Sequence, residues 1–417
     1  MKKYKWLLIP IIGNLFEWYE FAIFSSLSGV IGQLFFDTSD HFDATMFGLV
    51  VYGLAYIARP IGTLIFGYIG DKYGRKKALS SSLFVMCGAT FIIPFIPLYQ
   101  DIGVFASIIL IIIRVLQGIS FGGEFSSVIT YTCENSPVGK KGLFSAMQIS
   151  CVIIAIMMGL FTIYGLHYFY TDAEILLFAW KLPFFLAIFI GILGIYVRIN
   201  STETEEFIQA KKYGKTVKNP FLYFFKNYYK EFFICSTWFL NVSMCVQAFT
   251  IGSKSVFEII FGFNSVAATQ SGIAVCVITV PFMLLAGFLG EKFSSQNVRK
   301  IYTFSALIVS IFSCCLFASQ NSVSIFCGIL LMSIMFGIGN GLYPYYFYKH
   351  IPVYVRGTGV GFSIAIPAII AGGFGLFGFM KLFQIYGING IYIFVVIANI
   401  IGFIGLFLDY RYSNKKI

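Results

Sequence analysis

Residues 70–77 read GDKYGRKK, and this short basic segment lies between two long apolar stretches, Met46–Ile69 and Ala78–Leu98. A helix rises about 1.5 Å per residue, so about 20 apolar residues are needed to cross the hydrocarbon layer of a bilayer. Both neighbouring stretches reach that length. Residues 70–77 are therefore predicted to form a hydrophilic turn between two membrane-spanning helices.

The same alternation of apolar stretches and short polar turns runs through the whole chain. Of its 417 residues, 58% are hydrophobic and 11% are charged, and the mean hydropathy is +0.84, which is typical of proteins that lie in lipid. Twelve stretches are long enough to span a bilayer: Leu7–Val30, Met46–Ile69, Ala78–Leu98, Val104–Tyr131, Leu143–Tyr168, Ala179–Ile199, Phe232–Ile251, Val266–Leu289, Ile301–Ser319, Ser322–Tyr345, Thr358–Met380 and Ile388–Leu408. The sequence predicts an all-α membrane protein with twelve transmembrane helices.

The distribution of positive charge predicts how these helices are oriented. Most of the 29 lysine and arginine residues lie at the two termini and in alternate loops, those near Asp71, Lys140, Lys211, Lys292 and Lys349. Loops rich in lysine and arginine face the cytoplasm. We therefore expect a multi-pass protein of a bacterial cytoplasmic (inner) membrane with both termini in the cytoplasm. The net charge of +11 is explained by this pattern, so nucleic acid is not an expected partner.

The chain divides into two parts that resemble each other. The longest hydrophilic stretch inside the chain, residues 200–229, separates six predicted spans from six. GYIGDKYGRKK (residues 67–77) follows the second span, and GFLGEKFSSQNVRK (residues 287–300) follows the eighth. Many transporters are built from such repeated bundles, with the substrate site between them. We predict an N-terminal six-helix bundle (residues 1–199), a cytoplasmic linker (200–229) and a C-terminal six-helix bundle (230–417).

Ionisable residues inside the predicted spans are the first candidates for function, because a charge within hydrocarbon is costly unless it is paired or hydrated. There are five of them: Glu17, Glu20, Arg59, Arg114 and Glu124. The two glutamates of the first span are three residues apart and share one helix face. The rise per residue places them and Arg114 at similar depth near the middle of the bilayer. We therefore predict an ion pair between Glu20 and Arg114.

Such a pair has two possible roles. A buried carboxylate beside an arginine can bind and release a proton when the conformation changes, because burial and the arginine act on its pKa in opposite directions. On this interpretation Glu20 or Glu17 carries a coupling proton, and Arg114 partners the carboxylate or contacts an anionic group of a solute. The alternative is a permanent ion pair that holds two helices together.

The remaining intramembrane charges and the aromatic residues beside the glutamates support further predictions. Arg59 and Glu124 both lie toward the cytoplasmic side, which suggests a second pair with a gating or structural role. Trp18 and Tyr19 are interleaved with the glutamates, and aromatic faces attract quaternary ammonium groups, so a betaine-like solute could bind there. Packing within the bundle or against lipid is the alternative for both rings.

Two of these motifs are similar to those of the major facilitator superfamily. GDKYGRKK, with Gly70, Asp71, Gly74, Arg75 and Lys76, resembles the signature loop between its second and third helices. Arg114-x-x-Gln117-Gly118 resembles its fourth-helix motif, which makes Gln117 a further candidate for the solute or ion-pair site. The resemblance implies that Asp71 caps the N-terminus of a neighbouring helix. It also implies that Arg75 holds a carboxylate in the outward-facing state.

Within that superfamily the chain most resembles the metabolite:proton symporters, which include proline/betaine, α-ketoglutarate, shikimate and citrate carriers. The motifs are GNLFEWYEF (residues 13–21), ARPIG (58–62), the loop at Gly70, and residues 114–124. The resemblance implies symport of a small zwitterionic or carboxylate solute with protons by alternating access, driven by the proton gradient without a cofactor. The chain ends shortly after its last span, so osmotic regulation through a C-terminal coiled coil is not expected.

Other classes of function have less support in the sequence. A facilitator or exchanger without proton coupling fits the same helices. A membrane-embedded transferase would need paired aspartates, a histidine cluster or a nucleophile at a membrane face, and no phosphate-binding GxxxxGK[ST] segment is present. The nine cysteines lie in or beside apolar stretches without metal-ligand spacing. We therefore expect a transporter rather than an enzyme, without a metal site, and the sequence does not determine its oligomeric state.

Overall fold

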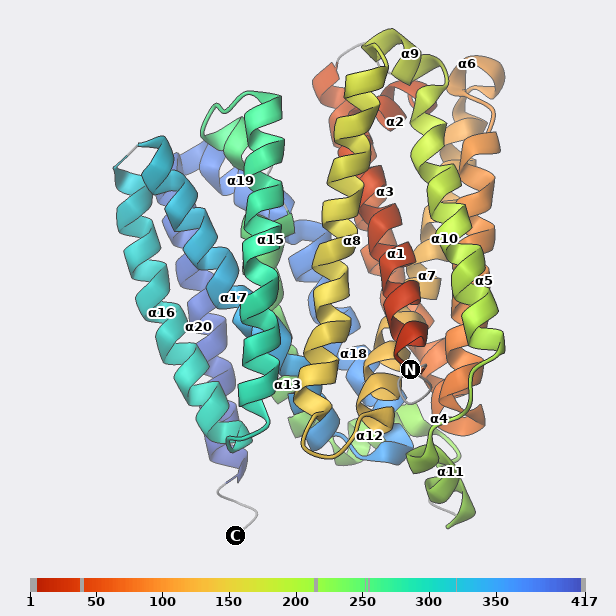
Figure 1. The fold of residues 1–417 in the computed structure, drawn as a ribbon, viewed down its shortest axis with the longest axis vertical. Coiled ribbons are helices and arrows are strands. Elements are labelled where there is room, and N and C mark those ends of the chain that lie inside the picture. The colour runs from red at the N-terminus through yellow and green to blue at the C-terminus, as the bar shows by residue number, and fades with distance from the viewer. Residues whose placement is uncertain are drawn as a thin grey trace.

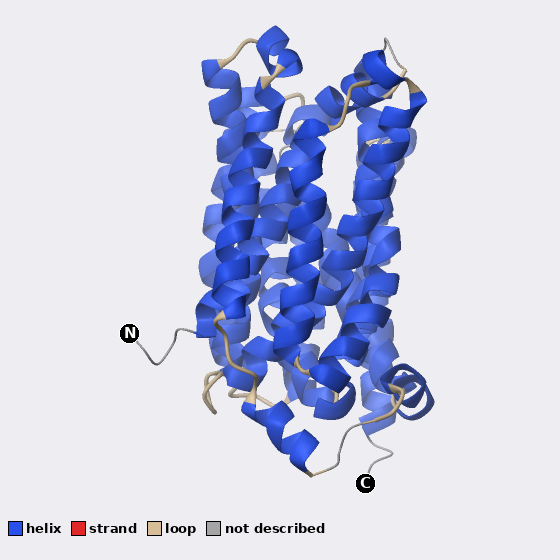
Figure 2. Cartoon of the chain, turned by 90° about the vertical axis from the view of Figure 1, so that its right-hand side faces the viewer, coloured by secondary structure: helices blue, strands red, loops and turns tan. Residues whose placement is uncertain are grey.

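The computed structural model describes residues 6–37, 41–213, 217–251, 253, 256–319 and 321–413. Within these ranges the chain is helical and contains no strand (Figure 2). Lys2 and Lys3 at the N-terminus, and Lys415 and Lys416 at the C-terminus, contribute to the predicted charge pattern but lie outside the described residues.

The predicted spans are present as long helices. Among the described residues, eleven helical stretches are long and apolar enough to cross a membrane: Phe47–Tyr73, Arg75–Phe95, Val104–Asn135, Lys141–Phe169, Ala179–Ile199, Tyr229–Thr250, Ala267–Gly290, Gln296–Ala318, Ser322–His350, Val353–Phe374 and Ile388–Tyr412. The remaining predicted span, Leu7–Val30, corresponds to α1 (Leu8–Ser26), which carries two glutamates and is largely buried inside the bundle. The predicted all-α, twelve-span fold is confirmed.

The helices form two groups that stand side by side (Figure 1). The N-terminal group comprises α1, α2 (Ser28–Phe35), α3 (His41–Gly62), α4 (Tyr68–Tyr73), α5 (Arg75–Ile92), α6 (Tyr99–Ile102), α7 (Val104–Asn135), α8 (Lys141–Phe169), α9 (Asp172–Leu177) and α10 (Leu182–Ile199). The C-terminal group comprises α13 (Tyr229–Val246), α15 (Ser265–Gly290), α16 (Ser295–Ala318), α17 (Ser322–His350), α18 (Arg356–Ala368), α19 (Gly375–Tyr386) and α20 (Ile388–Ser413).

The segment between the two groups forms two short helices, α11 (Glu205–Lys212) and α12 (Pro220–Asn227), at the lower end of the molecule in Figure 1. We call this end the linker end. Here α8 and α15 approach so closely that a Cβ added to Gly142 would lie 2.4 Å from the carbonyl oxygen of Gly287. Small residues allow this approach between membrane helices. The two groups are therefore in tight backbone contact at the linker end.

Three spans that line the boundary between the groups contain π-helical turns. These are η2 (Thr63–Gly67) after α3, η5 (Gln247–Ile251) after α13, and η8 (Ile369–Phe374) after α18. A π-turn leaves the regular hydrogen-bond ladder of the helix and occurs often at functional sites. The π-turns therefore suggest that a functional site lies at the boundary between the groups rather than on the outer surface.

Burial is distributed as expected for a protein in lipid. Large apolar side chains such as Phe84, Phe105 and Ile308 are exposed on the outer surface, whereas charged residues such as Glu20 and Arg114 are fully buried. An apolar exterior is stable in contact with acyl chains, and the interior can hold polar groups only where they satisfy one another or meet a ligand. The buried polar groups therefore mark the candidate functional site.

Candidate functional site

The first group of buried charges is the ion pair between Glu20 on α1 and Arg114 on α7. The Nη1 and Nη2 atoms of Arg114 lie 3.1 and 3.0 Å from the two carboxylate oxygens of Glu20. The guanidinium carbon of Arg114 also lies 3.2 Å from the centre of the Phe24 ring. The structure thus contains the contact that the depth argument predicted, while its role in proton coupling stays a prediction.

The second ion pair differs from the prediction. Glu124 on α7 pairs with Arg198 on α10, whose Nη1 lies 2.6 Å from Oε2, with a second, shorter contact from Nη2 to Oε1. The Ser82 hydroxyl donates to the same carboxylate at 2.8 Å. The predicted pair of Glu124 with Arg59 is wrong. Gly122 on α7 lies against the backbone of Arg59 on α3. Glu124 comes two residues later, which is about 200° around the helix, so its side chain faces away from α3.

Sequence reasoning missed Arg198 because it lies one residue before the end of the predicted span Ala179–Ile199, beside the hydrophilic stretch 200–229, where an arginine is expected to be solvated. Its guanidinium reaches inward and is buried, and it packs so closely on α1 that a Cβ at Gly13 would lie 1.7 Å from Nη2. The sequence signal is weak: a glycine four residues before Glu17 marks the face of α1 on which a large side chain packs.

Arg59 on α3 is buried, and no acidic side chain among the described residues forms an ion pair with it. Its guanidinium carbon lies 3.6 Å from the ring centres of both Tyr56 and Phe121, and more distantly faces Phe21 and Trp18. Its Nε and Nη2 atoms have no hydrogen-bond partner among the described residues. Cation–π contacts offset part of the cost of burying this charge, but they leave the N–H groups of Nε and Nη2 unsatisfied. Nε and Nη2 of Arg59 are therefore two buried donors of the kind that bind an anionic group.

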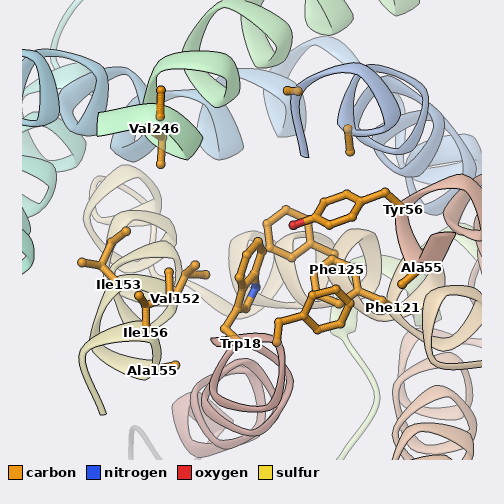
Figure 3. Packing of buried hydrophobic residues seen from close by; sticks show 14 of the residues in the cluster. Trp18, Ala55, Tyr56, Phe121, Phe125, Val152, Ile153, Ala155, Ile156 and Val246 are labelled. Carbon is orange, nitrogen blue, oxygen red and sulfur yellow. The ribbon is translucent and has the colours of Figure 1, made fainter. Parts of the chain in front are cut away.

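The position of Arg59 makes this feature relevant to both groups of helices. It borders a small cavity, with room for about one water molecule, between the two groups. The lining residues are Arg59, Phe121, Gly122, Phe125 and Ser126 from the N-terminal group and Gly361, Ile364 and Ala365 from α18. Figure 3 shows the aromatic rings of Trp18, Tyr56, Phe121 and Phe125 gathered in this region, with Val246 of the C-terminal group across from them.

We call the rings of Trp18, Tyr56, Phe121 and Phe125 the aromatic wall. Hydrogen bonds connect this wall to the C-terminal group. The Tyr56 hydroxyl lies 3.0 Å from the Tyr52 hydroxyl and accepts a hydrogen bond from Nε2 of Gln247, also at 3.0 Å. Gln247 is the first residue of the π-turn η5. The ring that stacks on Arg59 is therefore tied directly to the opposite group of helices.

Glu17 is the second unsatisfied charge. Both of its carboxylate oxygens are buried and have no hydrogen-bond partner among the described residues. The charged groups that act on it are Glu124, Arg198, Arg59 and Glu20. Glu17 is thus within electrostatic reach of the Glu124–Arg198 pair and of Arg59 but forms no hydrogen bond with either arginine.

Two predicted solute contacts, Tyr19 and Gln117, are used within the N-terminal group instead. The Tyr19 hydroxyl donates to Thr162 on α8 at 3.2 Å, and the Gln117 amide donates to Thr90 on α5 at 2.9 Å. Neither residue lines the cavity beside Arg59. Trp18 remains at the aromatic wall, and its indole N–H has no partner among the described residues.

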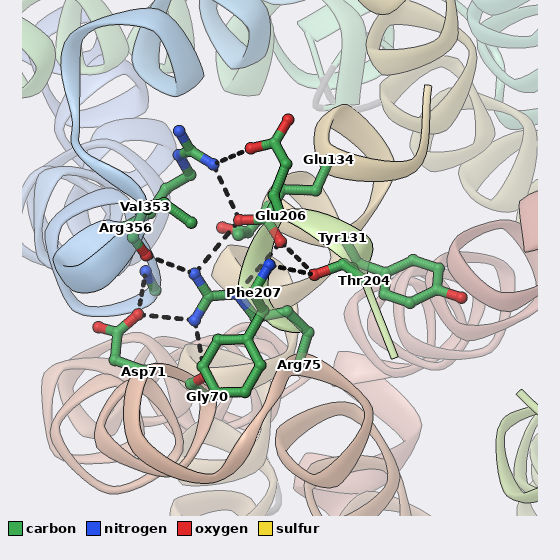
Figure 4. Close-up of polar contacts among 12 residues, drawn as sticks. Gly70, Asp71, Arg75, Tyr131, Glu134, Thr204, Glu206, Phe207, Val353 and Arg356 are labelled. Carbon is green, nitrogen blue, oxygen red and sulfur yellow. Dashed lines mark hydrogen bonds and ion pairs between the residues drawn. The ribbon is translucent and has the colours of Figure 1, made fainter. Parts of the chain in front are cut away.

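The signature loop residues form a buried polar network at the linker end (Figure 4). The Asp71 carboxylate accepts hydrogen bonds from the backbone N–H groups of Gly357 (2.9 Å) and Thr358 (2.8 Å) at the start of α18. Arg75 donates to Asp71 at 2.8 Å, to Glu134 at 3.2 Å and to the Val353 carbonyl at 2.6 Å. The contacts implied by the family resemblance are present, since an anion is stabilised at a helix N-terminus.

The loop also depends on its glycines and on the linker. Arg75 donates to the carbonyl of Gly70 at 2.6 Å. Gly74 has φ +117°, and a Cβ there would lie 2.1 Å from the Glu203 carboxylate. That carboxylate accepts the backbone N–H groups of Arg75 and Lys76 at 3.0 and 3.2 Å. A residue other than glycine at position 74 would break this contact and strain the backbone.

Glu206 on the linker helix α11 joins both groups of helices. It accepts hydrogen bonds from Lys141 on α8 (2.9 Å), Tyr348 on α17 (2.6 Å) and Arg356 on α18 (2.9 Å). Burial alone would raise the pKa of Glu206, but the hydrogen bonds from Lys141 and Tyr348 and the charge of Arg356 lower it below its usual value. The linker end is therefore closed by charged contacts that cross between the groups.

The described residues contain no cluster of three or more His, Cys, Asp or Glu side chains that could hold a metal ion. The site consists of paired and unpaired charges buried within the N-terminal group, together with aromatic faces around Arg59 and a hydrogen bond that reaches the C-terminal group.

Comparison with known proteins identifies the family. Residues 15–375 match the family model of the Major Facilitator Superfamily. A protein of Staphylococcus aureus (strain COL) named as a proline/betaine transporter is 32% identical over 368 residues, which cover 85% of this chain and 77% of that protein. The inner membrane metabolite transport protein YhjE of Escherichia coli (strain K12) is 27% identical, over 99% of this chain and 95% of its own length.

A solved structure shows the same fold. The proton:xylose symporter XylE, bound to 6-bromo-6-deoxy-D-glucose, superposes with a TM-score of 0.82 over 98% of this chain and 95% of XylE, at 15% sequence identity. These relatives are transporters rather than enzymes. On the match of its sequence and fold, the chain belongs to the Major Facilitator Superfamily and is a multi-pass membrane transporter.

Proposed function

We propose that this transporter is a proton-coupled symporter of a small zwitterionic or carboxylate solute. The observation that carries the proposal is the guanidinium of Arg59, which is buried, forms no ion pair with any described residue, and borders the cavity between the two helix groups. A carboxylate is the planar anion that matches a guanidinium, with two parallel hydrogen bonds. A solute bearing that group would satisfy both Nε and Nη2.

The aromatic wall favours a solute that also carries a cationic or apolar part. The guanidinium carbon of Arg59 lies 6.0 Å from the centre of the Trp18 ring but only 3.6 Å from the ring centres of Tyr56 and Phe121, so the Trp18 face interacts less with the arginine. Such a face attracts an ammonium group. The names of the Staphylococcus aureus and Escherichia coli relatives, which refer to proline/betaine and to metabolites, support this class of solute.

Transport would proceed by alternating access between residues 1–199 and 230–417, joined by the linker 200–229. The charge pattern supports a cytoplasmic location for the linker end and for both termini in a bacterial inner membrane. The contacts of Asp71, Arg75 and Glu206 would then hold the cytoplasmic side closed. They would break when the groups rock apart, so that access moves to the other side.

The driving force would be the proton gradient, without a cofactor. The buried acidic residues of α1, Glu17 and Glu20, are the candidate proton carriers, because a carboxylate in this environment changes its proton affinity when its arginine neighbours move. Partners are then the solute, protons and the lipid bilayer.

The test is uptake of labelled proline, glycine betaine, α-ketoglutarate, citrate and shikimate into proteoliposomes with an imposed pH gradient. We expect accumulation of at least one solute above its outside concentration, abolished by a protonophore. Uptake that a protonophore leaves unchanged would indicate a facilitator or exchanger instead. Absence of uptake for carboxylate-bearing solutes, with transport of a neutral one, would contradict the proposed solute class.

A further inference from the structure

Apart from the network at the linker end, six charged side chains are buried on α1, α3, α7 and α10, three acidic and three basic: Glu17, Glu20, Glu124, Arg59, Arg114 and Arg198. Two ion pairs use four of them, Glu20 with Arg114 and Glu124 with Arg198. The acid and the base that remain are Glu17 and Arg59. The set is therefore balanced in charge, but one acid and one base do not contact each other.

The two remaining residues lie close enough to act on each other electrostatically. Glu17 has two unpartnered oxygens, and Arg59 has two unpartnered nitrogens. They occupy adjacent helices, α1 and α3, and the Arg59 side chain is held away from Glu17 by its stacking between Tyr56 and Phe121. In this conformation each charge lacks the partner that the other could supply.

We propose that Glu17 and Arg59 form a switch that binds one proton and thereby couples proton transport to solute transport. In the empty carrier Arg59 leaves its stacked position between Tyr56 and Phe121 and binds the Glu17 carboxylate. A proton taken from water forms the O–H bond of Glu17 and frees Arg59, which then binds the carboxylate of the solute. Release on the other side reverses both steps: the solute leaves Arg59, the proton returns to water, and Glu17 binds Arg59 again.

This switch couples transport without any direct contact between proton and solute. One proton and one solute carboxylate add no net charge to Glu17 and Arg59, so this pair is neutral in both the loaded and the empty carrier, and both carriers can change conformation. A carrier with only the proton leaves Arg59 uncompensated, and a carrier with only the solute leaves Glu17 uncompensated. Both half-loaded states hold an unpaired buried charge, which is costly, and this suppresses leak.

The assignment favours Glu17 over Glu20 as the proton carrier. Glu20 makes two contacts with Arg114, so its carboxylate is already neutralised. The titratable or charged groups that face Glu17 are Glu124 on α7, Arg198 on α10, Arg59 on α3, Glu20 on α1, and the thiol of Cys87 on α5. Of the two arginines, Arg198 is fixed to Glu124 by two contacts, which leaves Arg59 as the base that can exchange partners.

The inference rests on the proposed function, and the experiment separates the two. Wild type, Glu17→Gln, Glu17→Asp and Glu20→Gln carriers are reconstituted in proteoliposomes with a solute that the wild type accumulates. Two assays are run: accumulation driven by a pH gradient, and exchange of labelled for unlabelled solute without a gradient. Glutamine imitates protonated Glu17, so Glu17→Gln should lose at least tenfold of the accumulation and keep exchange within about threefold of wild type.

The other variants complete the test. Glu17→Asp keeps the carboxylate and should restore accumulation, and Glu20→Gln should keep a response to the pH gradient even if less protein folds. Accumulation by Glu17→Gln at the wild-type level would overturn the switch, as would loss of both assays in Glu17→Gln without rescue by Glu17→Asp. Failure of the wild type to transport any panel solute would instead overturn the proposed function.

Discussion

The two helix groups share one architecture but differ in what they bury. Apart from the network at the linker end, the N-terminal group holds six buried charged side chains on α1, α3, α7 and α10, as two ion pairs and two residues without a hydrogen-bonded partner among the described residues. The described part of the C-terminal group buries neutral amides, with Asn241 donating to the Ala398 carbonyl and Asn399 to the Ser310 hydroxyl. Its buried charges, such as Arg299 and Arg356, lie near helix ends.

This difference indicates a division of labour between the groups. Charged pairs in a low-dielectric interior bind ions strongly and respond to protons, whereas neutral amides hydrogen-bond at small cost when partners change. The N-terminal group is therefore suited to bind the cargo and the proton. The C-terminal group supplies α18 and Gln247, which cover the site, and the carbonyl and N–H groups that close the linker end.

The largest expected effect is on the stability of the N-terminal group. Arg198→Gln would leave Glu124 buried without its partner, which we expect to cost about 3–5 kcal/mol and to lower the midpoint of thermal unfolding in detergent. The double variant Glu124→Gln/Arg198→Gln should recover much of that loss. Equal stability of the single variant and the wild type would mean that this pair contributes little and would weaken the contrast between the groups.

The next effect concerns solute affinity. Arg59→Gln removes the guanidinium that we propose to bind the carboxylate, so the dissociation constant should rise about 100-fold, or about 2.7 kcal/mol. Arg411→Gln, at an exposed arginine of α20, is the matched control and should leave affinity unchanged. Equilibrium binding of the labelled solute to purified carrier measures both, and unaltered binding by Arg59→Gln would move the site elsewhere.

A smaller effect is expected from the C-terminal group. Gln247→Leu removes one hydrogen bond to the Tyr56 hydroxyl, which is worth about 1 kcal/mol, so affinity should fall about fivefold. Because Gln247 is uncharged, the dependence of transport on the pH gradient should persist. A loss of proton coupling in this variant would show that the C-terminal group takes part in the charge chemistry after all.

The smallest effect concerns the linker end. The pKa of Glu206 is lowered, so its contribution to closure is present above its ordinary pKa near 4.5 and is lost only as the pH falls through the lowered value. Labelling of the buried thiol of Cys133 in a single-cysteine carrier reports opening at this end. Labelling, divided at each pH by the labelling of the same thiol in the unfolded carrier to remove the effect of thiolate formation, should be flat between about pH 6 and pH 8 and rise in Glu206→Gln. A rise of this corrected value in the wild type on going from about pH 8 to pH 6 would contradict the assignment.

How much of this could be predicted from the sequence follows from the kind of information each feature needs. The spans depend on length and apolar content, and the Glu20–Arg114 contact depends on depth along the helix axis, which residue number supplies. The partner of Glu124 depends on which helix lies beside which face of α7. Residue spacing alone gives the angle but not the neighbour, so Arg59 was chosen where α10 supplies Arg198.

The unsatisfied state of Glu17 and Arg59 could not be predicted for a related reason. Both residues were recognised as intramembrane charges, but whether a charge is paired depends on side-chain packing, here the stacking of Arg59 between Tyr56 and Phe121. The linker contacts of Glu206 likewise join residues from three distant segments of the chain.

The most direct test counts the protons taken up when the solute binds. Calorimetric titration of the wild-type carrier in two buffers with different ionisation enthalpies, above the pH at which affinity begins to fall, gives that number without any membrane or gradient. The account predicts uptake of about one proton per solute in the wild type, since Glu17 must be protonated for Arg59 to bind the carboxylate. Solute binding with no proton uptake would contradict it.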